Sequence, residues 1–288
     1  MEKTLFIRIE EKYAKMSKGQ KALASYLKKS LDKAVNKTAK ALAHDAGVSE
    51  PTVVRFATAL GYDGYKQLQK ALEEQALLLM DSVDRLRMAS ERIDRSDVLE
   101  STFNADIEKI RQTLGTIDSD AFDGAVDAIC RARKVYIAGI RSSAPLASFL
   151  YSYLNLMCEE VILLGSGTGG EMYEQMIHID LRDVIIAISF PRYSMGTIRA
   201  VDFAKKERAR VIAITDSEKS PISSQADFSL VAKSDMVSIV DSLVAPLSLV
   251  NALIVAVSMQ KGDDVADNMK KLEGFYTKYD FYDVAGSE

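Results

Sequence analysis

Four short apolar runs in the second half of the sequence constrain the fold more than any other feature. They span residues 135–138, 161–164, 184–188 and 211–214, begin 23 to 27 residues apart, and are separated by helical apolar periodicity. Runs that are apolar throughout are typical of strands covered on both faces. Because these separations suit helical crossovers and not hairpins, the sequence predicts a doubly wound parallel sheet, with a fifth strand at residues 227–231.

Composition places the chain among globular proteins. It has 288 residues, of which 48% are hydrophobic and 27% charged, which excludes disordered and collagen-like classes and favours two domains. We identify no run of about 18 uncharged apolar residues and no signal peptide, and expect a cytoplasmic protein with no membrane partner. Two cysteines, Cys130 and Cys158, and two histidines, His44 and His178, leave little material for disulfides, metal sites or histidine catalysis. We therefore expect no metal and no cofactor.

The charge is divided unevenly along the chain. Residues 1–80 hold 14 Lys and Arg against 9 Asp and Glu, whereas the remainder holds 23 against 32. Within residues 12–70 the count is 12 basic against 4 acidic. Such an excess favours a polyanion through counterion release, although lysines on exposed helix faces would produce the same count. A motif is needed to choose between these interpretations.

Residues 38–61 have the spacing of a helix-turn-helix. Thr38 is expected to cap a helix over residues 39–45, and Ser49 to cap a second helix after a glycine turn at residues 46–48. We also expect Ala43 and Gly47 to let the two helices approach closely. The second helix has an apolar stripe on one side and Gly61 as its C-terminal stop. The stripe consists of Val53, Phe56, Ala57 and Leu60.

The opposite face of the second helix is free to contact a partner in the major groove of DNA. Arg55 suits a guanine edge or a phosphate, while Thr52 and Val54 suit phosphates or thymine methyl groups. The candidate DNA contacts are Thr38, Ser49, Glu50, Pro51, Thr52, Val54 and Arg55. Helices over residues 17–35 and 64–80 complete an all-helical domain, residues 1–80, joined by a charged, partly helical linker, residues 81–100, to a second domain, residues 101–288.

Ligands of parallel sheets bind outside the carboxyl ends of the strands, here the loops at residues 139–145, 165–170 and 189–197. The first and third loops each open a helix and carry hydroxyls and an arginine. Hydroxyls there also serve as helix caps, but arginines on ligand-facing loops require a phosphate or carboxylate. The candidate ligand contacts are Arg141, Ser142, Ser143, Ser189, Arg192, Tyr193, Ser194 and Thr197.

The second loop matches the dinucleotide pattern GxGxxG, but the match is weak support for a nucleotide site. The loop follows the second strand, and Glu171 stands where a pyrophosphate would meet the helix N-terminus. A flexible turn or a ligand lid fits the loop better.

The stretch KALAHDAGVSEPTVVRFATALGYDGYKQLQ, from Lys40 on, resembles the helix-turn-helix of RpiR-type transcriptional regulators. The sheet domain resembles their sugar isomerase (SIS) domain, so the resemblance covers nearly the whole chain. It implies a bacterial repressor or activator of carbohydrate-metabolism genes, a homodimer or homotetramer. It further implies a palindromic double-stranded DNA operator and a phosphorylated sugar effector.

Within this resemblance, Ser143 falls on the phosphate-binding serine that follows the first strand. Ser189 and Ser194 fall on the first serine and the threonine of the family loop Ser-x-Ser-Gly-x-Thr. The chain departs from the pattern at Arg141, where glycine is usual, and at Pro191 and Arg192, which replace Ser and Gly. We therefore expect an anionic sugar effector, either a sugar phosphate or an acidic sugar, with a sugar-acid phosphate among the options.

Two other functions remain open. A sugar-phosphate isomerase would need a base, and Glu171, Glu174 and His178 are expected on one face of a short helix, although a solvated face explains them better. A metabolite-binding scaffold would contact protein instead of DNA. We expect a sensor and not an enzyme, with no catalytic residues. Residues 265–281 are expected to form a last helix that covers the sheet or joins a partner subunit.

Overall fold

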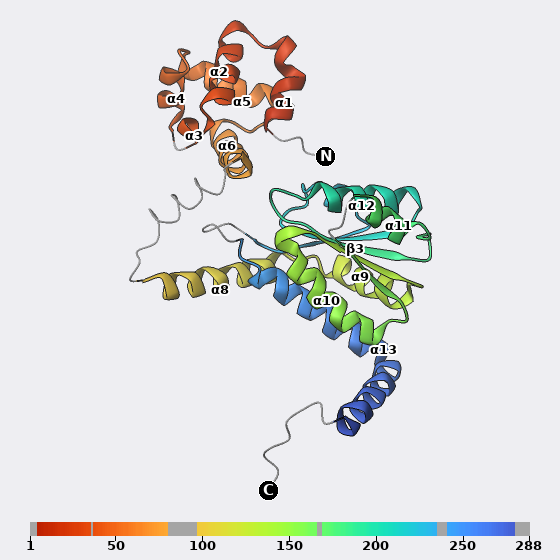
Figure 1. Cartoon of the computed structure of the whole chain (residues 1–288). Coiled ribbons are helices and arrows are strands. Elements are labelled where there is room, and N and C mark those ends of the chain that lie inside the picture. The colour runs from red at the N-terminus through yellow and green to blue at the C-terminus, as the bar shows by residue number, and fades with distance from the viewer. Residues whose placement is uncertain (1–4, 36, 80–96, 166–168, 235–240, 280–288) are drawn as a thin grey trace. The chain divides into compact units, whose positions relative to one another are not determined.

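The computed structural model describes residues 5–35, 37–79, 97–165, 169–234 and 241–279, which are divided between two compact units (Figure 1). Unit one comprises Met1–Met88 and unit two Ala89–Glu288. Most of the linker expected at residues 81–100 lies outside the described residues.

Unit one is all-helical and has its own apolar core. Its N-terminal helix was not predicted, and the helix expected over residues 17–35 is two helices because Ser30 leaves the helical conformation, at φ −143° and ψ 48°. The core contains Leu23, Phe56 and Leu68, all fully buried. The helices are α1 (Leu5–Lys12), η1 (Tyr13–Lys15), α2 (Lys18–Lys29), α3 (Leu31–Ala34), α4 (Ala39–Asp45), α5 (Glu50–Ala59) and α6 (Tyr65–Leu79).

Unit two contains a five-stranded sheet in which every neighbouring pair is parallel, which confirms the predicted fold class. The strand order is β2-β1-β3-β4-β5. The strands are β1 (Val135–Gly139), β2 (Val161–Leu164), β3 (Val184–Ile188), β4 (Arg210–Thr215) and β5 (Phe228–Val231). The helices are α8 (Val98–Thr116), α9 (Ser119–Arg131), η3 (Arg141–Ser143), α10 (Ala144–Met157), α11 (Gly169–Met176), α12 (Met195–Lys206), η4 (Ser223–Gln225) and α13 (Val244–Lys278).

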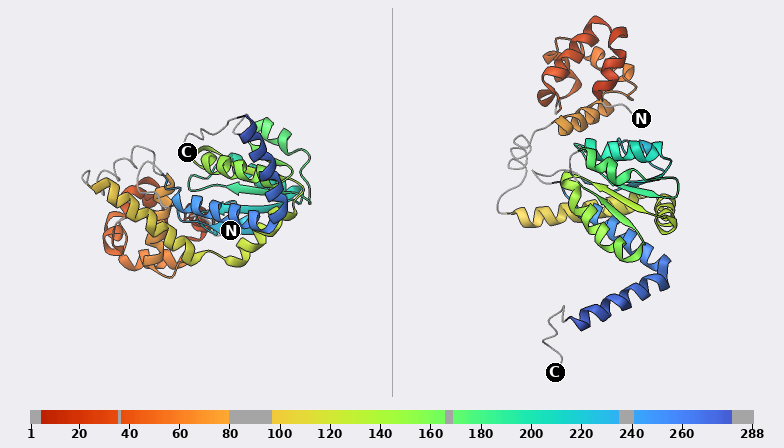
Figure 2. Two further views of the ribbon diagram at one scale, coloured as in Figure 1. Left: turned by 90° about the horizontal axis from the view of Figure 1, so that it is seen from below. Right: turned by 45° about the vertical axis from the view of Figure 1, so that its right-hand side comes forward.

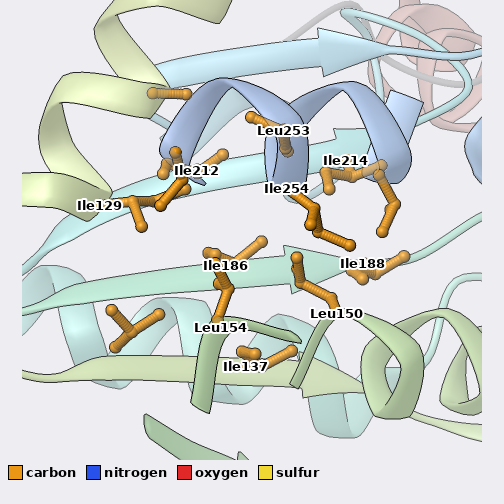
Figure 3. Close-up of a cluster of buried hydrophobic side chains, with 14 of the residues drawn as sticks. Ile129, Ile137, Leu150, Leu154, Ile186, Ile188, Ile212, Ile214, Leu253 and Ile254 are labelled. Atoms are coloured by element: carbon orange, nitrogen blue, oxygen red, sulfur yellow. The ribbon is translucent and has the colours of Figure 1, made fainter. Parts of the chain in front are cut away.

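Helices cover both faces of the sheet, with α11 and α12 on one face and α9, α10 and α13 on the other (Figure 1). Strand register sorts the side chains. Ile137, Ile186 and Ile212 are aligned across three strands and face α10 and α13 (Figure 3). The next row is alanine in all three strands and faces α12. Small residues on that side let α12 pack close to the sheet.

Helix α13 corrects one expectation. Of the helices in the described part of the chain, it alone is long and apolar enough to cross a membrane, whereas we identified no such run in the sequence. Its apolar composition has a structural cause, because Leu249, Leu253 and Val257 are buried in the core beneath the sheet. The chain kinks at Gly262, with φ 40° and ψ −103°, and the expected last helix is the continuation of α13 beyond that kink (Figure 2).

A buried ion pair joins the amino ends of β1 and β3. Arg133 donates from Nε and Nη2 to the two carboxylate oxygens of Asp183, at 2.9 and 2.7 Å. The Asp183 side chain is fully buried and also accepts from the backbone N–H of Asp180 at 2.8 Å. Hydrogen bonding to Asp183 raises the pKa of Arg133, so the guanidinium stays charged. The opposite, carboxyl edge of the sheet is left open for a site.

Candidate functional site

The helix-turn-helix of unit one is formed by α4 and α5. The Thr38 hydroxyl accepts from the Ala41 N–H at 3.2 Å, as a helix cap does. Gly47 adopts φ 65° in the turn and has no atom within 4 Å of the position of a Cβ, so its role is conformational and the expected close approach is wrong. Ser49 makes no side-chain cap, because its hydroxyl pairs with that of Thr52 at 2.9 Å.

The N-terminal helix α1 anchors the end of α5. Arg8 donates to the Leu60 carbonyl at 3.1 Å and Lys12 donates to the Ala59 carbonyl at 2.6 Å. Arg8 also lies over the Tyr62 ring, 4.8 Å from its centre. Cations at a helix C-terminus satisfy its last carbonyls and complement its dipole. Sequence reasoning missed this contact; the available signal was the spacing of Leu5 and Ile9, both buried in the core.

The side of α5 that faces away from the core is formed by Pro51, Val54, Arg55 and Thr58, which we call the outer face. All four are exposed, and Val54 keeps 41% of its surface. Thr58 continues the stripe four residues after Val54, and sequence reasoning missed it.

The remaining predicted contacts on α5 divide between exposed and half-buried side chains. Glu50 is exposed at the first position of the helix. Thr52 is half-buried, and its methyl group would lie 3.2 Å from a Cβ at Gly19 of α2. The structure therefore separates Thr52 from the outer face.

In unit two, the first and third predicted ligand loops follow neighbouring strands. The chain leaves β1 through α10 toward β2 and leaves β3 through α12 toward β4, on the other side. This divergence is the topological switch point at which parallel sheets bind ligands. The loops touch, since a Cβ at Gly196 would lie 2.6 Å from the Ile140 side chain. The tertiary fold thus brings the two loops together.

Several hydroxyls in these loops hold the loops themselves. Ser189 is buried and accepts from the Ser194 N–H at 3.2 Å, and Ser194 accepts from the Thr197 N–H at 3.5 Å as the cap of α12. Thr197 is fully buried and its hydroxyl has no partner among the described residues. Ser143 is buried without a side-chain cap, and Ser142 is exposed. These last three hydroxyls are the ones not used as helix caps.

Both loop arginines occupy left-handed backbone. Arg141 has φ 60° and Arg192 has φ 61°, a region that costs a non-glycine residue on the order of 1–2 kcal/mol. Glycine is usual at both positions of the pattern, so the chain keeps the turn and replaces the residue. Both side chains are exposed, and no hydrogen bond or ion pair joins either guanidinium to the described residues. Arg208, at φ 64° in the turn before β4, shows that the conformation alone does not define a site.

Asp216 extends this edge of the sheet and was not predicted. It follows β4 directly, and its Oδ1 accepts from the Tyr193 hydroxyl at 2.9 Å and from the Thr215 hydroxyl at 3.2 Å. Burial raises the pKa of Asp216 above its usual range. The Tyr193 contact ties the loop after β3 to the end of β4. A polar residue directly after a predicted strand was the signal available in the sequence.

The residues considered for catalysis do not converge on these loops. Helix α11 ends at Met176, so the expectation that His178 shares one helix with Glu171 and Glu174 is wrong. All three side chains are exposed. The His178 carbonyl accepts from Arg133 at 3.0 Å, at the amino edge of the sheet. Of the GxGxxG loop, residues 166–168 lie outside the described residues.

Comparisons with known proteins agree with this geometry. Residues 3–77 match the helix-turn-helix domain of the rpiR family, and residues 128–256 match the SIS domain. The fold and the two matches define a class: a helix-turn-helix transcriptional regulator carrying a sugar isomerase-type domain. Within that class, the chain belongs to the RpiR family.

Similar proteins span nearly the same length. The regulator HexR of Escherichia coli is 23% identical over 280 residues, 92% of each chain. The sugar isomerase domain of an RpiR transcription factor from Sphaerobacter thermophilus is 29% identical, with a TM-score of 0.59 over 62% of this chain and 98% of that one. NanR of Vibrio vulnificus, solved with ManNAc-6P, is 19% identical, with a TM-score of 0.59 over 95% and 98%.

Proposed function

We propose that the protein is a cytoplasmic, effector-responsive regulator of carbohydrate-metabolism genes, in which unit one binds operator DNA and unit two binds an anionic sugar. The observation that carries the proposal is the joining, in one chain, of a helix-turn-helix with an exposed outer face to a parallel sheet whose switch point carries two unpaired arginines.

Three features of unit one support DNA binding. The surrounding sequence has an excess of basic residues, which favours a phosphate backbone. Helix α5 is held at its C-terminal end by Arg8 and Lys12, so its exposed N-terminal half is presented on a fixed support. Thr38 begins α4, the helix that crosses the DNA backbone in this motif, and Arg55 lies one turn into α5.

The effector is proposed from the chemistry of the loops at the switch point. Arg141 and Arg192 supply two cations, and Ser142, Ser143 and Thr197 supply hydroxyls beside the N-termini of α10 and α12. This combination suits a phosphorylated or acidic sugar. The ligand of NanR is a phosphorylated sugar, which is consistent with that class.

The proposed assembly is a homodimer or homotetramer on a palindromic operator. Two copies of α5 related by a two-fold axis would enter the major groove about one turn of DNA apart, or a multiple of that distance. Effector binding would change operator affinity by favouring one quaternary arrangement over another.

Capture of fragmented genomic DNA by the purified protein, followed by sequencing, tests this function. The capture is run at moderate salt with and without a pool of sugar phosphates and sugar acids. We expect one palindromic site to be enriched and its recovery to change with the pool. Affinity for that site should fall steeply with salt, because phosphate contacts release counterions.

Two outcomes would contradict the proposal. Absence of enrichment under both conditions would remove the regulator function and favour a scaffold that contacts protein. Conversion of a sugar phosphate by the purified protein, lost in Glu174→Ala, would favour an isomerase. The exposed positions of Glu171, Glu174 and His178 give that activity no support.

A further inference from the structure

The outer face of α5 has an unusual composition for a helix in a basic domain. Arg55 is its only cation, and the other three members are Pro51, Val54 and Thr58. Val54 is a large aliphatic residue that keeps 41% of its surface although the adjacent core of unit one is well formed. An aliphatic side chain held at the centre of such a face is suited to apolar contact.

The neighbouring threonines differ in what they can offer DNA. Thr52 pairs its hydroxyl with Ser49 and turns its methyl group toward α2, so both of its groups are already engaged. Thr58 donates its hydroxyl to the Val54 carbonyl at 3.2 Å, and the residue remains exposed. Its hydroxyl is therefore engaged within the helix, and its methyl group is the part left to meet a partner.

Base edges in the major groove differ in what they accept. Thymine presents a methyl group that apolar side chains contact, guanine presents two acceptors that suit arginine, and adenine is bound in pairs of hydrogen bonds by Asn or Gln. The outer face has no Asn and no Gln. Arg55 has no hydrogen bond or ion pair within the described part of the chain and is available for a guanine.

We propose that Val54, together with the Thr58 methyl group, recognises thymine methyl groups that flank one guanine bound by Arg55. The operator half-site would then be thymine-rich around a single guanine. This inference rests on the proposed DNA-binding function and specifies the bases that the outer face selects.

Replacement of thymine by deoxyuridine tests the proposal, because it removes the 5-methyl group and leaves base pairing intact. Duplexes carrying the captured site are prepared with one deoxyuridine at each thymine of a half-site in turn. We expect at least one thymine next to the guanine at which the change weakens binding about fourfold, the factor given by burial of roughly one methylene-sized group.

Variants assign that effect to Val54. Val54→Ala should bind the unmodified duplex about fourfold more weakly and should no longer distinguish thymine from deoxyuridine at that position. Val54→Ile should retain the discrimination. Ile7→Ala is the matched control, since Ile7 is an equally exposed aliphatic residue, at 42%, on α1. It should leave discrimination unchanged.

The outcomes separate this inference from the function on which it rests. A site that is bound but insensitive to deoxyuridine at every thymine would overturn the inference and leave DNA binding in place. Discrimination that persists in Val54→Ala would assign thymine recognition to another residue and also overturn it. A protein that captures no DNA would overturn both.

Discussion

At the scale of single residues, the most informative feature is a pair of arginines on backbone that glycine adopts without strain. Arg141 and Arg192 each follow a neighbouring strand and share φ near 60°. A side chain placed there costs folding free energy, so the guanidinium must bring a compensating contribution in the bound state. We infer that both are retained for ligand contact.

Two substitutions at Arg192 separate backbone strain from ligand contact. Arg192→Gly removes both the strain and the guanidinium, whereas Arg192→Ala removes only the guanidinium. We expect the glycine variant to be more stable than the alanine variant by roughly 0.5–1 kcal/mol in urea unfolding, because relief of strain exceeds glycine's gain in unfolded-state entropy. Both variants should lose affinity in calorimetric titrations with glucose 6-phosphate or 6-phosphogluconate, whichever binds the wild type. Unchanged affinity in both would exclude direct contact by Arg192.

At the scale of elements, the two ends of the sheet have different roles. The amino ends of β1 and β3 are held by the Arg133–Asp183 pair, in which a fully buried carboxylate has a bidentate partner. Helix α9 packs so closely on β5 that a Cβ at Gly124 would lie 2.3 Å from the Phe228 ring. Rigid packing at one end leaves the carboxyl-end loops free to be shaped for a ligand.

Loss of Arg133 should therefore destabilise unit two strongly. Arg133→Leu leaves the Asp183 carboxylate buried and unpaired, and we expect a loss of about 3–5 kcal/mol in urea unfolding. Arg131→Leu is the control, because Arg131 forms an exposed pair with Asp127 and should change stability by no more than about 0.5 kcal/mol. Similar losses in the two variants would contradict a structural role for the buried pair.

At the scale of the whole molecule, the chain has separate cores for its two units. The core of unit one contains only helical residues, and the clusters on both faces of the sheet belong to unit two. Charge follows the same division, with the basic excess in the first 80 residues and the acidic excess in the rest. Each unit thus has its own source of stability and its own class of partner.

Calorimetry should resolve two unfolding transitions in the full chain. A ligand that binds one folded unit raises the transition of that unit by mass action. We expect the bound sugar to raise one transition and the captured operator duplex to raise the other. A single transition, raised equally by both, would show instead that the two units unfold as one cooperative body.

Much of the fold could be predicted from the sequence because its signals are local. The four apolar runs predicted the first four strands to within a residue at either end, and Thr38 correctly predicted the start of α4. The break at Ser30 and the loss of the Ser49 cap could not be predicted, because each depends on neighbours brought close by packing.

The sequence by itself determined the parallel sheet, the helix-turn-helix and the strand ends at which a ligand would bind, because periodicity and spacing are properties of the chain. Only the tertiary structure decided which side chains those sites present. It turned Thr52 toward α2, left Val54 and Thr58 exposed, and joined Asp216 to Tyr193 across two strands. These outcomes depend on contacts between residues distant in sequence, and no local pattern encodes them.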